Sequence, residues 1–507
     1  MANIVNGSFL VGRQVILDAR RRIYLAPWLG LTTNGEWKIK DQSARAIVTA
    51  VQLPQVTDSE FEASLSELRE LAKTLGFEVV GTFTQKRTKF ETTAYLGVGK
   101  RHEMRRFVEN DSELGDGPGS STVHGSVKKA PKSGAARAKE AANSAADPET
   151  RRADVVLVDH EISPSQARNL EIEVGCEVMD RTMVILEIFH RHARSRAARA
   201  QVEIARLRYL APRLREAAKL AGPKGRQRSG TGGRGAGEAH SEMDRQKIRK
   251  RIGELQEEIA VMDGERKTQR ARRQEGQGLA RVALVGYTNA GKSTLMRALT
   301  GSEVLVEDKL FATLDTTVRA LHPESMPRVL VSDTVGFIKN LPHDLVASFK
   351  STLEEAVEAS LLIHVIDASD PELERQLEVT SKVLDEIGAQ AVPRILVFNK
   401  IDCVGDATAQ AACKAALRVH YPESVVLSAR HEADVARLRA AILEFFQRDL
   451  VEARLFLPWA AQKQRGEIFA KCEVLEERAD EKGAFFRVRG ERDTVNALRE
   501  QLGPATE

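Results

Sequence analysis

The stretch that most constrains the fold of this chain is Val282 to Thr294, VALVGYTNAGKST. Residues 282–285 are apolar and predict a buried strand, which passes directly into the pattern Gly286-x-x-x-x-Gly291-Lys292-Ser293. The two glycines allow a tight turn whose backbone N–H groups point at a phosphate. A helix beginning near Ser293 directs its positive end at the same place. This order of strand, loop and helix predicts a phosphate-binding loop.

The side chains of this loop have separate expected roles. Lys292 supplies a positive charge for the β- and γ-phosphates of a nucleotide. The hydroxyl of Ser293 is a natural ligand for the Mg²⁺ that accompanies such a nucleotide. The sequence therefore predicts a nucleoside triphosphate and Mg²⁺ as cofactors.

The chain is long enough for several domains. It has 507 residues, and 76 Lys and Arg nearly balance 72 Asp and Glu. The 4 cysteines are scattered and show no metal-ligand spacing, which favours a reducing cytoplasm. The N-terminus shows no signal-peptide pattern, and no apolar run approaches the ~20 residues of a membrane span. We expect a cytoplasmic protein that is a monomer.

The N-terminal part predicts a small α/β domain at 44–180, after an extension at 1–43. Strands are expected at 44–53 and 77–83, with a helix between them whose apolar residues Phe61, Leu65, Leu68, Leu71 and Leu75 recur at helical spacing. A second strand–helix–strand unit is expected at 155–179. Residues 111–152 are rich in Gly, Ser, Ala and charge, which predicts a disordered insert.

A helical hairpin is predicted at 181–278. One long helix is expected from 182 to 220 and a second from 241 to 274. In the second helix Ile248, Ile252, Leu255, Ile259 and Met262 are spaced 4, 3, 4 and 3 residues apart, which indicates a coiled-coil seam. The joining loop at 221–237 contains seven Gly and four basic residues and no acidic residue.

Positive charge is concentrated on this hairpin. Between Arg181 and Arg228 there are thirteen Lys or Arg and three Asp or Glu. A solvated helical face is the simple interpretation, but such a face usually carries balanced pairs of charges. We therefore expect a phosphate-rich partner. Since the loop has no aromatic residue, base stacking is not the expected mode. The candidate RNA-binding residues are Arg206, Arg208, Arg213, Lys224, Arg226, Arg228 and Arg234.

The nucleotide domain is expected at 279–449, with its polar motifs at the ends of predicted strands, where open α/β sheets bind ligands. A loop at 308–314 carries Thr313, placed to sense the γ-phosphate. A strand ends in Asp333-Thr334-Val335-Gly336, whose acid can hold Mg²⁺ through water and whose glycine N–H can reach the γ-phosphate.

Two further motifs concern the base. Asn399-Lys400-Ile401-Asp402 follows a strand at 395–398, and Ser428-Ala429 follows a strand at 425–427. The carboxylate of Asp402 can accept from N1–H and the exocyclic amine of guanine, a pair of donors that adenine does not offer. GTP is the predicted nucleotide.

The position just after Gly336 predicts slow hydrolysis. Many small GTPases carry a glutamine there that orients the attacking water, and this chain has Phe337. Phe337 can pack in the core, or water can be positioned from elsewhere once a partner docks. We expect slow intrinsic turnover that a cellular assembly stimulates.

Four blocks form a specific combination: GYTNAGKSTL at 286–295, LFATLD at 310–315, DTVGFIKNLPHDLV at 333–346 and STLEEA at 351–356. In these blocks, and in SPSQARNLE at 163–171 and QVEIARLRYLAPRL at 201–214, the chain resembles the HflX family of ribosome-associated GTPases. The resemblance implies a P-loop GTPase domain, preceded by an α/β domain with a long antiparallel hairpin and followed by a small α/β domain, here at 450–507.

The resemblance also implies roles for single residues. Lys292, Thr313, Asp333 and Gly336 would be catalytic, and Ser293, Thr313 and Asp333 would lie on the Mg²⁺ side. The nucleotide-binding residues would be Gly286, Asn289, Ala290, Gly291, Lys292, Ser293, Thr294, Asn399, Lys400, Asp402, Ser428 and Ala429. The chain departs from the family pattern at Asp315-Thr316-Thr317, where relatives have Asp-Pro-Thr, and in the hairpin loop.

The implied partner is the large ribosomal subunit with its ribosomal RNA, and the implied activity is the splitting or rescue of stalled ribosomes. A GTPase that acts in ribosome assembly remains an alternative. A different class of protein, an RNA-binding adaptor that uses the nucleotide only for stability, is a second one.

Overall fold

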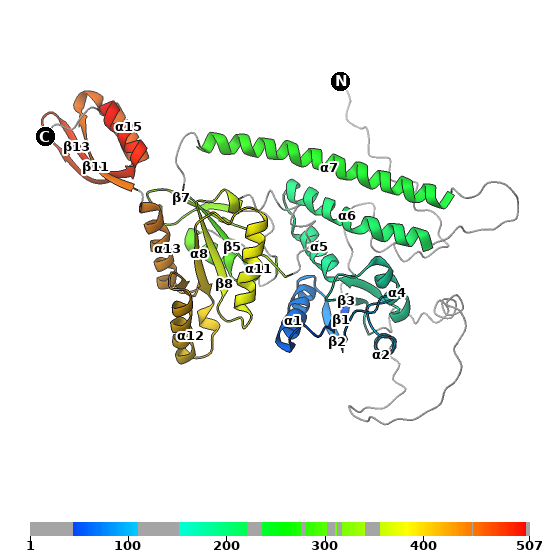
Figure 1. The fold of residues 1–507 in the computed structure, drawn as a ribbon. Coiled ribbons are helices and arrows are strands. Elements are labelled where there is room, and N and C mark those ends of the chain that lie inside the picture. Colours follow the sequence, from blue (N-terminus) through cyan, green and yellow to red (C-terminus); the bar gives the residue numbers. More distant parts are fainter. Residues whose placement is uncertain are drawn as a thin grey trace, which may run out of the picture. The chain divides into compact units, whose positions relative to one another are not determined.

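The computed structural model describes residues 44–109, 152–220, 236–274, 280–301, 310–311, 317–339, 355–448 and 450–502. Contacts group everything from Arg45 onward into one compact unit. The chain path is drawn in Figure 1. The predicted extension at 1–43, the predicted insert up to residue 151 and the loop at 221–235 lie outside the described residues.

The N-terminal domain is built on a four-stranded parallel sheet with the order β2-β1-β3-β4. Its strands are β1 (Arg45–Gln52), β2 (Glu78–Lys86), β3 (Val155–Val158) and β4 (Glu177–Asp180). The helices that accompany them are α1 (Asp58–Thr74), α2 (Val98–Val108) and α4 (Pro164–Val174). β1 and β3 are buried almost throughout, as expected for parallel strands with both faces covered. The two strand–helix–strand units are confirmed.

Helix α1 begins where its sequence supplies a cap. The side chain of Thr57 accepts from the N–H of Glu60, and two acidic residues occupy the first turn. The five apolar residues predicted to line this helix and its end, Phe61, Leu65, Leu68, Leu71 and Leu75, are all buried.

The helix expected at 182–220 is two helices, so this prediction is wrong in its boundaries. The chain forms α5 (Arg181–His192) and α6 (Arg196–Leu220), with an extended residue, Ala193, after α5. Ser195 accepts from the N–H of Ala198 and so starts α6 as a new helix. Because residues 181–189 of α5 are all buried, α5 belongs to the core of the α/β domain.

The predicted coiled-coil seam is confirmed between α6 and α7 (Ala236–Gln274). Leu255 of α7 is 2% exposed and packs with Ala200 and Ile204 of α6. Ile252 and Ile259 flank this contact. The two helices lie side by side in Figure 1.

One carboxylate fixes the second half of α6 against the sheet. Asp180, fully buried at the end of β4, accepts from the backbone N–H groups of Ile162 (3.3 Å) and Met183 (2.9 Å). It also accepts from the Tyr209 hydroxyl (2.5 Å) and the Arg213 guanidinium (2.7 Å) of α6. Four donors around one buried carboxylate satisfy its hydrogen-bonding capacity and tie α6 to the end of β4.

The central domain is an α/β domain with a six-stranded sheet in the order β10-β9-β8-β5-β7-β6. All neighbours are parallel except β6, which runs antiparallel to β7. The strands are β5 (Ala280–Gly286), β6 (Thr317–Ala320), β7 (Val329–Asp333), β8 (Leu361–Asp367), β9 (Arg394–Asn399) and β10 (Val425–Val426). The helices are α8 (Lys292–Thr300), α11 (Leu373–Glu386), α12 (Ala407–His420) and α13 (Glu432–Gln447).

The C-terminal domain is a three-stranded antiparallel sheet with the order β11-β13-β12. Its elements are β11 (Leu450–Pro458), α14 (Arg465–Lys471), β12 (Glu473–Ala479), β13 (Gly483–Glu491) and α15 (Arg492–Leu502). Its core combines Leu455 and Phe486 of the sheet with Ile468 of α14 and Leu498 of α15. None of the helices in the described part of the chain has the length and apolar character to cross a bilayer.

The seam predicts that Leu255→Ala weakens the hairpin. Removing a buried leucine side chain leaves a cavity and costs about 2–5 kcal/mol. We expect faster amide hydrogen exchange along α6 and α7. The matched control is Val261→Ala on the same helix, because Val261 is 65% exposed. Equal exchange in the two variants would contradict the seam.

Candidate functional site

The phosphate-binding loop joins β5 to α8, as the sequence predicts. Gly291 adopts a φ of +92°, and a Cβ there would lie 2.3 Å from the amide nitrogen of Asn399, so glycine is required. The Nζ of Lys292 donates to the carbonyl oxygens of Gly286 (3.1 Å) and Tyr287 (2.8 Å). Burial lowers the pKa of Lys292 to about 8, and the nearby carboxylate of Asp333 opposes this shift. The two hydrogen bonds hold the ammonium of Lys292 at the phosphate-binding loop. A bound phosphate would stabilise its positive charge there.

Two of the predicted metal ligands meet at the start of α8. The Oγ of Ser293 donates to Oδ2 of Asp333 over 2.8 Å, and Asp333 is fully buried at the end of β7. A hydroxyl and a carboxylate this close are the hard oxygen ligands that suit Mg²⁺. The third predicted ligand, Thr313, lies outside the described residues.

The segment after Asp333 lies directly on the phosphate-binding loop. The N–H of Phe337 donates to the carbonyl of Gly286 (3.1 Å), and the N–H of Thr288 donates to the carbonyl of Phe337 (2.7 Å). A Cβ on Gly336 would lie 2.9 Å from Lys292 Nζ and 2.9 Å from the backbone Cα of Thr288, so a larger residue would not fit against the phosphate-binding loop. The ring of Phe337 is buried in the core with Val285 and Leu362, which agrees with the packing interpretation.

Asn399 connects the loop at 399–402, the predicted base-recognition loop, to the phosphate-binding loop. Its Nδ2 donates to the carbonyl of Ala290 over 2.9 Å. Its Oδ1 accepts from the N–H of Ala429, also over 2.9 Å. The side chain is almost fully buried, and both of its polar ends are satisfied. Three of the predicted motifs are thus brought together by one amide.

The other residues of the base-recognition loop are also placed at this edge of the sheet. Lys400 adopts a φ of +62°, and its Nζ pairs with Oδ2 of Asp367 over 2.8 Å. The carboxylate of Asp402 lies 3.8 Å from the guanidinium of Arg430, and its side chain is 25% exposed. Asp402 is therefore open to a base that would approach from solvent.

The structure adds residues to this site that the sequence reasoning missed. Asp367 orients Lys400, and Asp434 accepts from the N–H of Ser428 over 2.9 Å. Asp367 ends the buried strand β8, so the strand-end rule that identifies Asp333 could have found it. Asp434 lies inside a helix and carried no such signal.

Two of the predicted RNA-binding arginines, Arg213 and Arg206, make ion pairs within the protein. Arg213 pairs with buried Asp180 and stacks on the ring of Tyr209, 4.3 Å from its centre. Arg206 is mostly buried and lies 3.9 Å from Glu187. Arg208 lines a cavity of about 190 Å³ beside α6. The other four, Lys224, Arg226, Arg228 and Arg234, lie outside the described residues.

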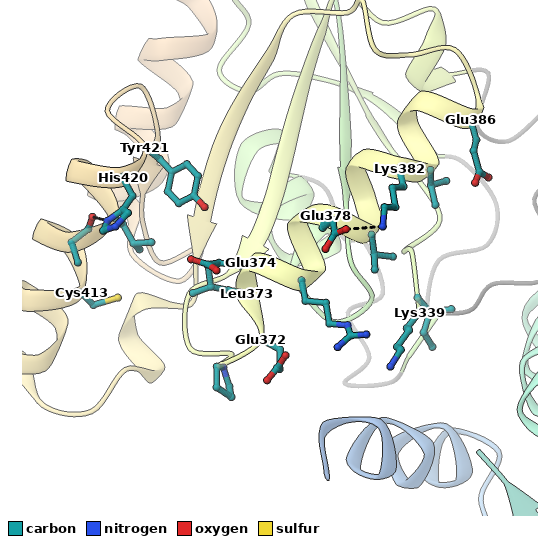
Figure 2. A pocket seen from close by; sticks show the side chains of 17 residues that line it. Lys339, Glu372, Leu373, Glu374, Glu378, Lys382, Glu386, Cys413, His420 and Tyr421 are labelled. Carbon is teal, nitrogen blue, oxygen red and sulfur yellow. Dashed lines mark hydrogen bonds and ion pairs between the residues drawn. The ribbon is translucent and has the colours of Figure 1, made fainter. Parts of the chain in front are cut away.

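A larger cavity of about 1000 Å³ lies between α11 and α12 (Figure 2). Its walls carry Glu378 and Lys382, paired over 2.6 Å, and Tyr421, and Lys339 lies at its edge. None of the predicted nucleotide-binding residues lines it. The nucleotide-binding residues predicted from the sequence are therefore separate from this cavity.

One buried histidine lies behind the phosphate-binding loop. His364 of β8 is fully buried between Val285 of β5 and Leu396 of β9. Burial lowers its pKa to about 3, and the positive charges of Arg394 and Lys292 act in the same direction. The folded protein therefore holds His364 neutral.

Three sequence models of protein families match the chain in succession. Residues 62–114 and 124–190 match one described as the GTP-binding GTPase N-terminal region. Residues 192–273 match the GTP-binding GTPase middle region. Residues 281–400 match a family described as 50S ribosome-binding GTPase.

Curated relatives match over most of the chain. GTPase HflX of Gluconacetobacter diazotrophicus is 52% identical over 463 residues, which cover 90% of this chain and 97% of the relative. GTPase HflX of Caldanaerobacter subterraneus is 39% identical and covers 87% of this chain and 89% of the relative. GTPase HflX of Escherichia coli K12 is 40% identical and covers 66% and 76%.

His364 predicts a specific loss of stability in acid. Its pKa is about 3 in the folded protein and about 6.5 when unfolded, so its contribution is complete above pH 6.5. As the pH falls from 7 to 5, protonation of the unfolded chain should cost about 2 kcal/mol. His364→Leu should remove this part of the pH dependence of the free energy of unfolding. Chemical denaturation at pH 7 and at pH 5 measures it. An unchanged slope would contradict the assignment.

Proposed function

The chain belongs to the HflX family of GTPases, and from this premise we propose that it is a GTP-hydrolysing switch that docks on the large ribosomal subunit. The observation that carries the proposal is the pair of hydrogen bonds made by Asn399. They join the loop that would read the base to the loop that would hold the phosphates. A nucleotide bound along this edge would contact both.

The proposed recognition of GTP uses the two ends of this edge. Asp402 would accept from N1–H and the exocyclic amine of guanine, with Lys400, Ser428 and Ala429 around the base. Lys292 and the backbone N–H groups of residues 289–294 would hold the phosphates. Asn289, Ala290, Gly291 and Thr294 belong to this cradle.

Ser293 and Asp333 would hold Mg²⁺, with Thr313 as the third proposed ligand. The ion would neutralise charge that develops on the phosphates during hydrolysis. Gly336 would place its N–H at the γ-phosphate. Since Phe337 is packed in the core, this chain offers no side chain there to orient water. We therefore propose slow turnover that the ribosome stimulates.

The large subunit is proposed as the partner for two reasons. The family matched by 281–400 is described as a 50S ribosome-binding GTPase. The hairpin loop also carries Lys224, Arg226, Arg228 and Arg234 without an acidic residue, which suits ribosomal RNA. With this partner we propose a cytoplasmic location and a role in the splitting or rescue of stalled ribosomes. The alternative proposals are a role in ribosome assembly and a protein that only binds RNA and uses the nucleotide for stability.

Lys292→Ala separates a switch from an adaptor. Loss of the buried ammonium should weaken GTP binding by at least about 100-fold, since a charged hydrogen bond to phosphate is lost in a site of low dielectric. Under the switch model, sedimentation with ribosomes and a non-hydrolysable GTP analogue should fall with it.

The control is Lys382→Ala, whose side chain is 69% exposed on α11. Ribosome binding that survives Lys292→Ala would favour the adaptor. Separation of the subunits in the same gradients would indicate splitting, and binding only to immature particles would indicate assembly.

The basic loop predicts salt-dependent docking. Changing Lys224, Arg226, Arg228 and Arg234 to Glu should weaken ribosome binding and flatten its dependence on salt, because each phosphate contact releases counterions. GTP affinity should stay unchanged. Arg478→Glu, on an arginine whose side chain is 79% exposed in the C-terminal domain, is the matched control. Unchanged ribosome binding in the loop variant would exclude this docking surface.

A further inference from the structure

A tyrosine inside the phosphate-binding loop has partners that nucleotide binding does not explain. The hydroxyl of Tyr287 donates to Oε1 of Glu67 over 2.6 Å. The same hydroxyl accepts from the backbone N–H of Lys339 over 2.8 Å. Glu67 lies on α1, and Lys339 lies three residues after Gly336. One hydroxyl therefore connects the phosphate-binding loop, α1 and the segment at 333–339, which we call the second switch segment.

Glu67 is itself held by a buried polar network. Its Oε2 pairs with Arg181, whose Nη1 donates to Oδ1 of Asp159 over 2.8 Å. Oδ2 of Asp159 accepts from the hydroxyl of Ser64 over 2.7 Å. Arg181 and Asp159 are each 3% exposed. An ion network this buried is costly to break by removing one partner, so Glu67 is a fixed point for the Tyr287 hydroxyl.

The same helix makes a second contact with the segment around Lys339. Oε1 of Glu60 accepts from Lys339 Nζ over 3.0 Å and lies 2.6 Å from Nη2 of Arg375. These partners, Arg375 first, lower the pKa of Glu60 to about 2. Figure 2 shows Lys339 at the edge of the α11–α12 cavity, on the side away from α12.

Two residues of the loop at 308–314, which we call the first switch segment, also contact this part of the chain. The N–H of Leu310 donates to the hydroxyl of Thr74, the last residue of α1, over 3.2 Å. The ring of Phe311 packs edge-on against Phe189 of α5, with the ring centres 4.6 Å apart. Leu310 and Phe311 begin the LFATLD block. In GTPases the two switch segments become ordered when the γ-phosphate is bound. In this chain the first switch segment contacts α1 and α5, and the second contacts α1.

We propose that Tyr287 is a positioning residue that couples the nucleotide to the N-terminal domain, with Glu67 as its receiving partner. A shift of the second switch segment moves the N–H of Lys339 and so changes the bond that the hydroxyl makes to Glu67. Through α1 that change reaches the domain that carries the hairpin. The proposal rests on guanine nucleotide binding at the phosphate-binding loop.

A purely structural role would need the ring of Tyr287 but not its hydroxyl. A phenylalanine fills nearly the same space and keeps the backbone bonds of the loop, including the bridge to Phe337. The hydroxyl is the only atom of this side chain that joins Glu67 to Lys339 in the described contacts. Tyr287→Phe therefore tests coupling with little disturbance of packing.

The experiment measures amide hydrogen exchange of the full-length protein with GDP and with a non-hydrolysable GTP analogue. In the wild type we expect exchange in α1 to differ between the two nucleotides. Tyr287→Phe should reduce that difference at least twofold, because it removes the hydroxyl that bonds to both Glu67 and Lys339. Tyr421→Phe removes a hydroxyl elsewhere in the same domain and should leave the difference intact.

GDP affinity, measured by calorimetry on the same samples, separates this proposal from the proposed function. Affinity within threefold of wild type with a reduced exchange difference supports the coupling. An unchanged exchange difference in Tyr287→Phe overturns it, and so does a tenfold loss of GDP affinity, which would make Tyr287 a part of the phosphate-binding loop itself. A wild-type protein that takes up no GDP would overturn the proposed function as well.

Discussion

The nucleotide site depends on one buried amide side chain. Asn399 ends β9, yet its two polar atoms bond to Ala290 in the phosphate-binding loop and to Ala429 beyond β10. These three positions come together because parallel strands bring their carboxyl ends to one edge of a sheet. If the amide were lost, a buried carbonyl and a buried N–H would each lack a partner, at about 1–3 kcal/mol apiece. The two hydrogen bonds that position Asn399 for nucleotide binding thus also stabilise the folded domain.

The parts of the fold and site that could be predicted from the sequence are those specified locally. The turn at Gly291 needs a glycine, the strand before it needs apolar residues, and Asp333 needs only to end a buried strand. The seam around Leu255 could be predicted for the same reason, since its spacing is written in one helix. In each case the residues that carry the signal lie within a few positions of one another.

The parts that could not be predicted depend on partners far away along the chain. Arg213 lies in the basic stretch of α6, but it pairs with Asp180 at the end of β4, 33 positions earlier. The break between α5 and α6 is set by the hydroxyl of Ser195, which the apolar period does not report. Tyr287 is one of the unspecified positions in the Gly286-x-x-x-x-Gly291 pattern, and its hydroxyl bonds to Glu67, 220 positions earlier.

The hydrogen bonds to Asp180 also limit the movement of the end of α6. Tyr209 and Arg213 meet this carboxylate well along α6, which ends at Leu220. The overhang beyond Arg213 is therefore 7 residues of helix, or roughly 10 Å at 1.5 Å per residue. A helical segment this short moves little when it tilts, because a tilt of about 5° displaces its end by less than about 1 Å. The direction of the last turns of α6 is thus set by the parallel sheet to which Asp180 belongs.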